Sequence, residues 1–213
     1  MSGDADLRAS LAHAVQLFPA LPIESLAHYV GDILRWNDEL GLVSKKDPIA
    51  ACERLVIESA EFGGVVAEAL TAGESRIRVA DVGSGAGFPG IVWRWLFPEW
   101  ELTLVERRDR KAAFLEHIVP HLRLQNVEVV ASDARDLSRH ERYRGSFDVV
   151  ATMAVGEPAR TAPQIEGLLT PNGLFATTLP GDADPEDRCG TGLMLESDLR
   201  AQFGRYARYR KRV

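Results

Sequence analysis

Apolar residues recur at steps of three and four along the first third of the chain. From Pro22 onward, and with charged residues between them, they fall at Leu26, Tyr29, Val30, Ile33, Leu34 and Leu40. This spacing is typical of an amphipathic helix. A second apolar-rich segment runs from Cys52 to Leu70, and Thr71-Ala72-Gly73 is expected to end it. We therefore predict that residues 1–73 form a helical cap.

The pattern changes after Gly73, where short β-rich runs alternate with longer helical ones. The predicted strands are Ile77–Val82, Leu102–Val105, Val127–Ala131, Phe147–Thr152 and Leu174–Thr178. The predicted helices between the first three strands are Gly87–Phe97 and Arg110–Leu122. Such alternation is typical of a mostly parallel sheet with helices on both faces. We predict an α/β fold in which residues 74–213 form a doubly wound, mostly parallel sheet and the N-terminal helices are an extension.

The last third of the chain is less regular. Three prolines interrupt the connection after the fourth predicted strand, at Pro158, Pro163 and Pro171. The segment Gly181–Gly192 is rich in acidic residues and glycine, which predicts a loop or a locally disordered segment. We expect a last helix over Leu193–Phe203 and a last strand over Tyr206–Val213.

Length and composition narrow the class of protein. A chain of 213 residues that is 46% hydrophobic is expected to form one compact domain, alone or with a helical extension. Cys52 and Cys189 lie far apart, which disfavours a disulfide scaffold and a cysteine zinc site and fits a reducing cytoplasm. There is no apolar run of the ~20 residues that cross a bilayer, so we expect a soluble cytoplasmic protein without membrane contact.

The charge is unevenly distributed. The formal net charge is -6, and residues 1–73 carry 5 Lys+Arg against 11 Asp+Glu, whereas residues 74–213 carry 20 of each. This balance argues against a protein that coats nucleic acid by bulk electrostatics. Basic residues nevertheless cluster within 107–111, 135–144 and 205–212. These clusters are either solvated faces or discrete contacts for a polyanion.

The strongest candidate for chemistry is a glycine-rich turn between a predicted strand and a helix. Residues 79–91 read Val-Ala-Asp-Val-Gly-Ser-Gly-Ala-Gly-Phe-Pro-Gly-Ile. In an open parallel sheet, ligands bind outside the carboxyl ends of the strands, where this turn lies. Gly83, Gly85 and Gly87 permit tight backbone angles and remove the Cβ atoms that would keep a ligand away. The turn therefore predicts a site for a nucleotide-like cofactor, with Asp81 bracing the loop.

Two cofactors are compatible with such a turn. Residues 85–90 match the dinucleotide pattern G-x-G-x-x-G, but Pro89 removes one of the N–H groups that hold a pyrophosphate, and Gly83 directly follows the strand. S-adenosylmethionine has no phosphate and needs close backbone approach and an acid for its ribose. Glu106 ends the next predicted strand and supplies that acid. A nicotinamide oxidoreductase is the weaker alternative.

The adenine of such a cofactor is expected beside the run Ala131-Ser132-Asp133-Ala134-Arg135-Asp136, after the third predicted strand. Asp133 could accept from the exocyclic amine while the backbone of Ala134 donates. A helix cap is an equally good role for Asp133.

Several motifs together resemble the RsmG/GidB family of bacterial 16S rRNA guanine-N7 methyltransferases. They are Asp81-Val-Gly-Ser-Gly-Ala-Gly-Phe-Pro-Gly-Ile, Leu104-Val-Glu106, Arg110-Lys111-Ala-Ala-Phe-Leu115, Asn126-Val127 and Phe147-Asp148-Val-Val. A helix with Trp36-Asn37 extends the likeness to roughly residues 25–180. The resemblance implies a class I S-adenosylmethionine-dependent methyltransferase fold and cofactor, and 16S rRNA or the small ribosomal subunit as partner.

The resemblance also implies site residues. Asn37 and Lys111 would lie near the acceptor as the catalytic candidates. The candidate cofactor-binding residues, from the turn, the acidic positions and the resemblance together, are Asp81, Gly83, Ser84, Gly85, Gly87, Phe88, Glu106, Arg107, Asp133, Ala134, Arg135 and Met153. No metal site is expected, because the five histidines show no ligand spacing, and Ser59 and Ser84 lack the His–acid pair of a hydrolase.

Two departures from the family pattern affect the acceptor side. Leu55-Val-Ile-Glu58-Ser59 stands where the family shows His-x-x-Asp-Ser, and Met153 stands where it has an arginine after the fourth strand. Both changes make the expected acceptor pocket more apolar. Two alternatives therefore stay open, a methyltransferase for a small molecule or peptide and an inactive S-adenosylmethionine-binding paralogue.

Overall fold

The structure is a computed structural model that describes residues 2–70, 76–183, 185–186, 188–190 and 192–212. Three helices lead the chain, α1 (Ser2–Leu17), α2 (Ile23–Leu40) and α3 (Pro48–Glu68). The expected end of the third helix at residues 71–73 lies outside the described residues. The remaining helices are α4 (Gly90–Leu96), α5 (Asp109–His121), α6 (Ala134–Leu137), α7 (Pro158–Ile165) and the short 3₁₀ helix η1 (Glu166–Leu168).

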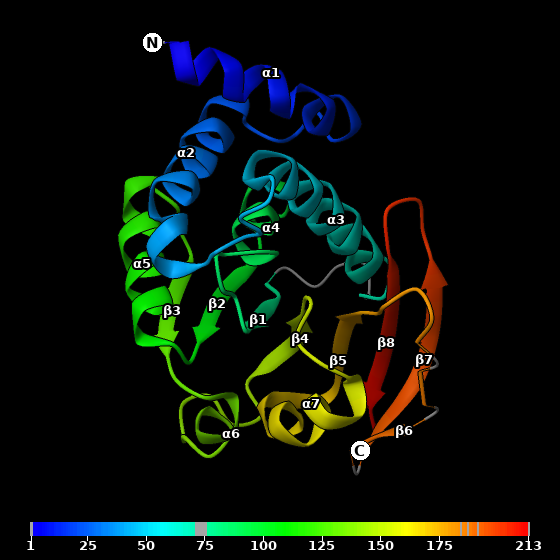
Figure 1. Cartoon of the computed structure of the whole chain (residues 1–213). Coiled ribbons are helices and arrows are strands. Elements are labelled where there is room, and N and C mark those ends of the chain that lie inside the picture. The colour runs from blue at the N-terminus through cyan, green and yellow to red at the C-terminus, as the bar shows by residue number, and fades with distance from the viewer. Residues whose placement is uncertain (1, 71–75, 184, 187, 191, 213) are drawn as a thin grey trace.

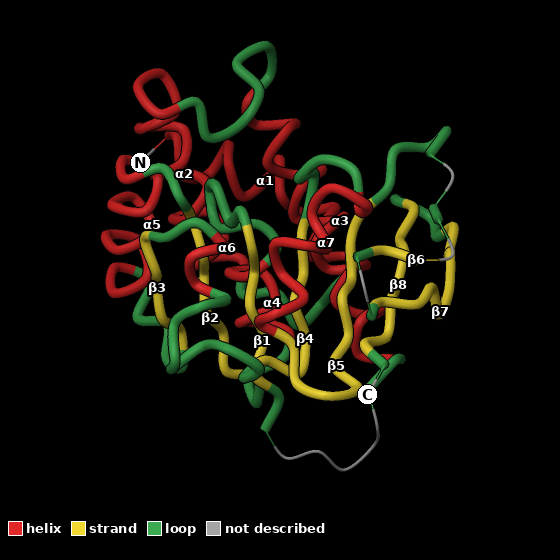
Figure 2. The backbone as a smooth tube through the Cα atoms, turned by 90° about the horizontal axis from the view of Figure 1, so that it is seen from below, coloured by secondary structure: helices red, strands yellow, loops and turns green. Residues whose placement is uncertain are grey.

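Eight strands in the described residues form one sheet in the order β3-β2-β1-β4-β5-β8-β7-β6. They are β1 (Arg78–Val82), β2 (Glu101–Glu106), β3 (Val127–Ala131), β4 (Phe147–Thr152), β5 (Leu169–Thr178), β6 (Arg188–Cys189), β7 (Leu193–Arg200) and β8 (Arg205–Lys211). The first five pair in parallel, whereas β8, β7 and β6 pair antiparallel. Figure 2 shows the strands side by side in this order from β3 to β7. The predicted doubly wound, mostly parallel sheet is confirmed.

Helices cover both faces of the sheet (Figure 1). Helices α6 and α7 pack on one face through Leu137, Ala162 and Ile165, which share a buried cluster with Val150 of β4. On the other face α3 and α4 pack through Phe62 and Trp93. Leu26 and Val30 of α2 share a further cluster with Leu104 of β2, so the N-terminal helices and the sheet have apolar core in common. The division into residues 1–73 and 74–213 stays a prediction.

The segment predicted as the last helix is a strand. Leu193–Arg200 pairs with β8 as β7, in the register Leu195↔Tyr209 and Leu199↔Tyr206. The register shifts between Leu195 and Ser197. An irregularity of this kind breaks the alternation of apolar and polar residues that reveals a strand. The predicted strand that follows is confirmed as β8, and the predicted loop 181–192 contains the two-residue β6, with 184, 187 and 191 outside the described residues.

Two adjacent glycines in α3 give a test of its packing. A Cβ on Gly63 would lie 2.8 Å from Nε1 of Trp93 in α4 and 2.5 Å from Cε2 of Phe97 just after it, whereas a Cβ on Gly64 would meet nothing within 4 Å. We expect Gly64→Ala to stabilise the protein by about 0.5–1 kcal/mol through helix propensity. Gly63→Ala should destabilise it by about 1–3 kcal/mol, because it overpacks the contact with α4. Urea unfolding measures both, and a stabilising Gly63→Ala would contradict the close approach of α3 and α4.

Candidate functional site

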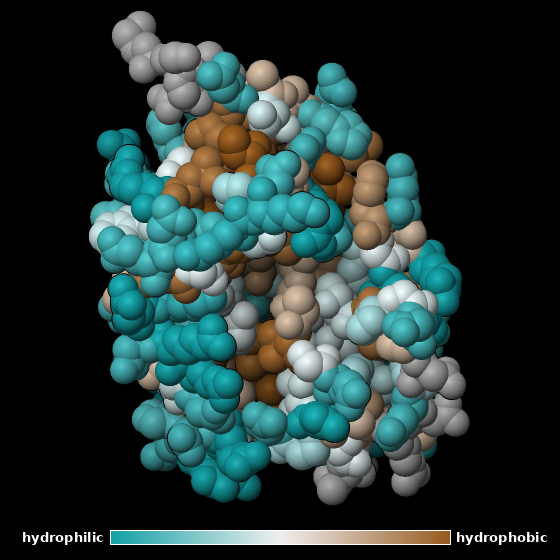
Figure 3. All heavy atoms as spheres, in the orientation of Figure 1, coloured by the Kyte–Doolittle hydropathy of each residue, from teal (hydrophilic) through white to brown (hydrophobic). Residues whose placement is uncertain are grey.

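A cavity of about 440 Å³ lies at the carboxyl ends of β1 and β2, beside β4. Between β1 and β4 the order of the parallel strands reverses, which is where open α/β sheets bind ligands. Figure 3 shows the molecule hollowed near the centre of one face, with apolar residues in the depth of the hollow. The predicted residues that line the cavity are Gly83, Gly85, Glu106, Arg107, Lys111, Asp133 and Ala134.

The glycine turn forms one wall of this cavity, and two of its glycines have different roles. Gly83 has φ +81°, and a Cβ there would lie 2.7 Å from Cγ2 of Val155 in the loop after β4. Gly85 has φ +59°, and a Cβ there would meet only the carbonyl oxygen of Gly83, at 3.7 Å. Gly83 is therefore required for packing between two loops, whereas Gly85 leaves open space at the cavity.

Glu106 is the buried acidic residue of the cavity, and its side chain is held in place at both oxygens. It is 6% exposed, and its Oε2 accepts from the backbone N–H of Gly85 at 3.0 Å. Its Oε1 accepts from the N–H of Arg108 at 2.8 Å. A carboxylate has about four lone-pair sites, so each oxygen keeps capacity for one more donor. Glu106 can therefore receive two hydroxyl groups without losing its own supports.

Asp133 serves as a helix cap and also lines the cavity. Its Oδ1 accepts from the N–H of Arg135 at 2.9 Å at the start of α6. Its Oδ2 lies 3.9 Å from Nη1 of Arg107. The side chain of Arg135 is exposed and is not among the cavity's lining residues, whereas Ala134 lines the cavity. The cap does not exclude a ligand contact, because the carboxylate has further acceptor sites.

Asp81 near the end of β1 and Ser84 in the turn itself are buried and do not line the cavity. Asp81 is fully buried, and its Oδ2 accepts from the N–H of Gly90 at 3.1 Å. Ser84 Oγ donates to the carbonyl of Asp81 at 2.8 Å. Burial is the main cause that raises the pKa of Asp81 to about 8, and the charge of Glu106 adds to it. This geometry matches the bracing role expected for Asp81.

The raised pKa of Asp81 predicts a dependence of stability on pH. The folded-state pKa lies above the value of about 3.9 in an unfolded chain, so the folded state binds the extra proton. The unfolding free energy should then fall as pH rises from about 4 to about 8, by up to about 1.4 kcal/mol per pH unit. Asp81→Asn still offers an acceptor to Gly90 but does not titrate. We expect urea unfolding at pH 5 and pH 7.5 to show a smaller change in this variant; equal changes in both proteins would contradict a neutral Asp81.

The other predicted residues lie around the cavity rather than in its lining. The ring of Phe88 is buried against Tyr29, with centroids 5.3 Å apart, and Gly87 donates its N–H to Ser84 O at 2.7 Å. Met153 is buried, with its sulfur 3.5 Å from Ser59 Oγ. These contacts stabilise the conformation of the glycine turn and of the end of β4.

The two residues expected near the acceptor both form hydrogen bonds at the C-terminal end of α2. Asn37 is buried, and its Oδ1 accepts from the N–H of Val43 at 2.9 Å. Lys111 lines the cavity, and its Nζ donates to the carbonyl of Gly41 at 2.8 Å. Burial and the charge of Arg108 lower the pKa of Lys111. Lys111 therefore lines the cavity, whereas Asn37 is not among the lining residues and supports the turn after α2.

Comparison with known proteins identifies the family of this chain. The family model described as "GidB: rRNA small subunit methyltransferase G" matches residues 22–186. The chain belongs to this family. Ribosomal RNA small subunit methyltransferase G of Roseiflexus castenholzii is 39% identical over 137 residues, which are 64% of this chain and 56% of that protein. The chain spans little more than half the length of the first curated relatives that it matches.

Solved structures agree with this family at the level of the fold. A putative methyltransferase, yhhF, from Escherichia coli has a TM-score of 0.55 at 17% identity, covering 72% of this chain and 87% of that chain. A SAM-dependent methyltransferase from Aquifex aeolicus has a TM-score of 0.51 at 16% identity, covering 71% and 89%. These likenesses show that the GidB chain has a methyltransferase fold.

The far wall of the cavity in this GidB protein was not predicted from the sequence. It consists of the loop after β4 and of α7, and its lining residues are Ala154, Val155, Gly156, Arg160, Thr161, Gln164 and Ile165. Ala154 has φ +57° and Gly156 has φ +61°, so the loop turns sharply. Pro158 and Pro163, which suggested a connection, lie inside α7, and Pro158 occupies its start, where proline is favoured. The preference of proline for the first turn of a helix was the sequence feature from which α7 could have been predicted.

Basic residues of the C-terminal cluster form hydrogen bonds with other parts of the GidB chain. Arg208 donates to Val65 O and Ser197 Oγ, and Arg210 donates to Ala69 O and to Glu196. Lys211 donates to the carbonyls of Glu166 and Leu169. These cations hold the last strands against α3 and η1, which is a structural role.

No helix in the described part of the GidB chain has both the length and the apolar character to cross a membrane. Within the same residues, no group of three or more His, Cys, Asp or Glu side chains is arranged to hold a metal ion.

Proposed function

We propose that this GidB protein is an S-adenosylmethionine-dependent methyltransferase that modifies small-subunit ribosomal RNA, with guanine N7 as the acceptor atom. The observation that carries the proposal is Glu106, a buried carboxylate fixed by two backbone N–H groups at the cavity and beside the open Gly85. The names of its relatives support the RNA substrate. Because ribosomal RNA is made in the cytoplasm of bacteria, we propose that location for the protein.

The residues present fit the cofactor. Glu106 would accept from the two ribose hydroxyls, and Gly85 would allow the ligand close to the backbone. Asp133 and Ala134 would border the adenine. The cations that line the cavity and could pair with the carboxylate of the cofactor are Arg107, Arg108, Lys111 and Arg160. When bound, S-adenosylmethionine supplies a methyl group on a positively charged sulfur. The other predicted residues, Asp81, Ser84, Gly87, Phe88, Arg135 and Met153, would act by shaping the turn and its surroundings.

The protein's own contribution to such a reaction is alignment. Guanine N7 has a lone pair and no proton to remove, so no general base is required at the acceptor atom. Holding two reactants in line replaces a bimolecular encounter and can lower the barrier by about 7–11 kcal/mol. Lys111 lies at the cavity with a lowered pKa, and Asn37 fixes the turn that carries Gly41. We propose that these two residues position the acceptor side of the site.

Transfer of labelled methyl groups tests this function. Purified protein with labelled S-adenosylmethionine is incubated with small-subunit RNA from cells that lack the modification, and large-subunit RNA is the control. We expect label in the small-subunit RNA alone. Calorimetry should show heat with S-adenosylmethionine and S-adenosylhomocysteine but not with NAD. Cofactor binding without RNA labelling would favour a small-molecule or peptide acceptor, or a protein without catalysis.

A further inference from the structure

A second and larger groove adjoins the cofactor cavity. It has a volume of about 1170 Å³, and Ala154, Gly156 and Arg160 line both spaces. The loop between β4 and α7 is therefore the wall between them. A molecule that lies in the groove reaches the edge of the cofactor cavity at this loop. The groove is thus placed to hold the acceptor of a transfer reaction.

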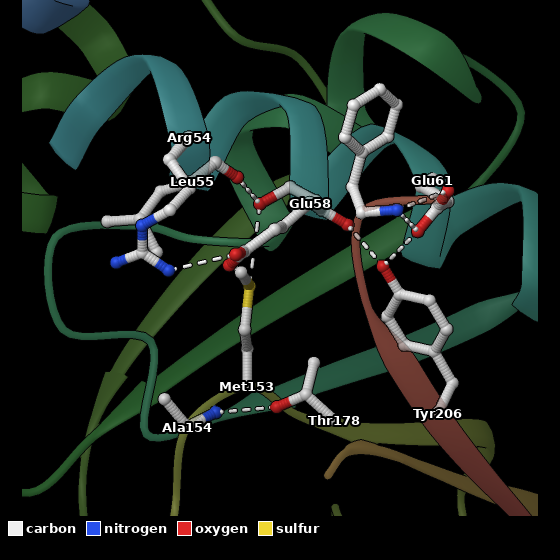
Figure 4. A network of polar contacts seen from close by, with 10 residues as sticks. Arg54, Leu55, Glu58, Glu61, Met153, Ala154, Thr178 and Tyr206 are labelled. Carbon is white, nitrogen blue, oxygen red and sulfur yellow. Dashed lines mark hydrogen bonds and ion pairs between the residues drawn. The ribbon is translucent and has the colours of Figure 1, made fainter. Parts of the chain in front are cut away.

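The groove is preformed, because two of the elements that line it are tied together. One is α3, and the other is the turn between β7 and β8. Glu61 of α3 accepts from the N–H of Phe203, with both oxygens at 3.1 Å, and from the hydroxyl of Tyr206 at 2.7 Å. Figure 4 shows Glu61 and Tyr206 directed toward each other between the helix and the strand. A ligand would not have to order these elements on binding.

The shared wall is fixed as well. The N–H of Ala154 donates to Thr178 Oγ1 of β5 at 2.9 Å, and Figure 4 shows this contact below Met153. Thr161 Oγ1 lies 3.1 Å from the carbonyl oxygens of Val155 and Glu157, to which it can donate. These contacts hold the loop at both of its ends.

Arginines project along the groove from separate elements. Arg54 comes from α3, Arg160 from α7 and Arg200 from the end of β7. Arg205 also lines the groove but is paired with Asp198. Three acidic residues, Glu58, Glu157 and Asp182, also line the groove. The positive charge is therefore confined to separate arginines and does not form a continuous patch.

Arg54 and Arg160 form ion pairs in which the guanidinium side is exposed. Arg54 lies 2.8 Å from Glu58 Oε1, and Arg160 lies 3.2 Å from Glu157 Oε2, with the arginine side chains 62% and 83% exposed. Exposed pairs contribute little to stability. A guanidinium can therefore turn from its acid to a phosphate, with which it forms short, charge-assisted hydrogen bonds. Arg200 donates to the carbonyl of Gly181 at 3.1 Å and is also exposed.

The groove also offers apolar surface between its charges. Phe203 is partly buried and lies in the turn between β7 and β8, and Leu179 and Pro180 line the same space. An aromatic ring among arginines is the combination on which single-stranded nucleic acids bind, with bases stacked and phosphates paired.

We propose that this groove binds a single-stranded segment of the acceptor RNA, with phosphates at Arg54 and Arg200 and a base on Phe203. The proposal rests on the function proposed above. The target nucleotide lies at the loop 154–156, beside the cofactor cavity. Arg160 lines both spaces and contacts whichever anionic group lies at their junction.

The test uses the full chain and the double variant Arg54→Gln/Arg200→Gln, because neither residue lines the cofactor cavity. The matched control is Arg76→Gln, an exposed arginine 3.1 Å from Glu101 at the opposite end of the sheet. We expect the double variant to lose about 10-fold or more in kcat/KM for small-subunit RNA through a higher KM. Its salt dependence should weaken by about 0.7 in log–log slope for each lost phosphate contact. Affinity for S-adenosylmethionine should stay unchanged by calorimetry.

Three results would overturn the proposal, and they are distinguishable. Activity of the double variant equal to that of Arg76→Gln would exclude the groove while leaving the function intact. A loss of S-adenosylmethionine affinity would assign the arginines to the cofactor instead. No methyl transfer by the unsubstituted protein would overturn both the function and the groove. Phe203→Leu gives a second measurement, for which we expect a loss of about 5-fold or more in kcat/KM from stacking.

Discussion

Replacing Glu106 by glutamine is expected to remove most of the affinity for S-adenosylmethionine. The amide keeps one acceptor oxygen but loses the charge and gains a donor that faces the N–H of Gly85 or of Arg108. A hydrogen bond to a charged group is worth about 1.5–3 kcal/mol, so the loss at two hydroxyls should be about 2–4 kcal/mol. Calorimetry should then report an affinity lower by about 30- to 1,000-fold.

The control for this variant lies on the same strand. Glu101→Gln changes the same residue type at the other end of β2, away from the cavity. We expect it to leave the affinity unchanged. Thermal unfolding without ligand should show that Glu106→Gln is still folded, since one of its two backbone contacts survives. An unchanged affinity in folded Glu106→Gln would mean that the cofactor does not bind at Glu106.

Gly83→Ala is expected to lower the unfolding free energy by about 2–4 kcal/mol. A residue with a Cβ pays about 1–2 kcal/mol in the left-handed region, and Gly83 has φ +81°. The added Cβ would also lie 2.7 Å from Cγ2 of Val155. Overpacking by one methyl group adds about 1–2 kcal/mol, in the lower part of the usual range. Affinity for S-adenosylmethionine should fall too, because the loop 154–156 must move.

A double-mutant cycle separates the two causes. Val155→Ala removes the Cγ atoms and leaves a Cβ that lies 3.8 Å from the new methyl group. In this background, Gly83→Ala should cost only the backbone strain, so the coupling in urea unfolding should be about 1–2 kcal/mol. Additive effects would contradict the contact between the glycine turn and the loop after β4.

The parallel part of the fold could be predicted because its signals are local. Each buried strand is a short apolar run, and the glycine turn marks the passage from β1 to α4. The antiparallel part was harder, because its strands depend on distant partners. Leu195 and Leu199 are four residues apart, a spacing that suits a helix as well as a strand with an irregular register. Pairing with β8 determines the outcome, and a single sequence does not reveal it.

The same contrast between local signals and distant partners applies to the candidate site. The residues on the glycine turn and at the ends of β2 and β3 follow from the rule that ligands bind at the carboxyl ends of strands. Met153 was expected in the site because of its place after β4, but its side chain points to Ser59. Arg160 and Thr161 could not be found, because their approach to the cavity depends on the turn at Ala154 and Gly156. No motif of the sequence encodes that turn.

The most direct test of the account is a crystal structure of the protein with S-adenosylhomocysteine. We expect the ribose hydroxyls within hydrogen-bond distance of both Glu106 oxygens and the adenine beside Asp133 and Ala134. The homocysteine part should follow the turn at Gly83 and Gly85, with its sulfur directed to the loop 154–156. A ligand bound elsewhere, or a cavity closed by side chains in the presence of saturating ligand, would contradict the account.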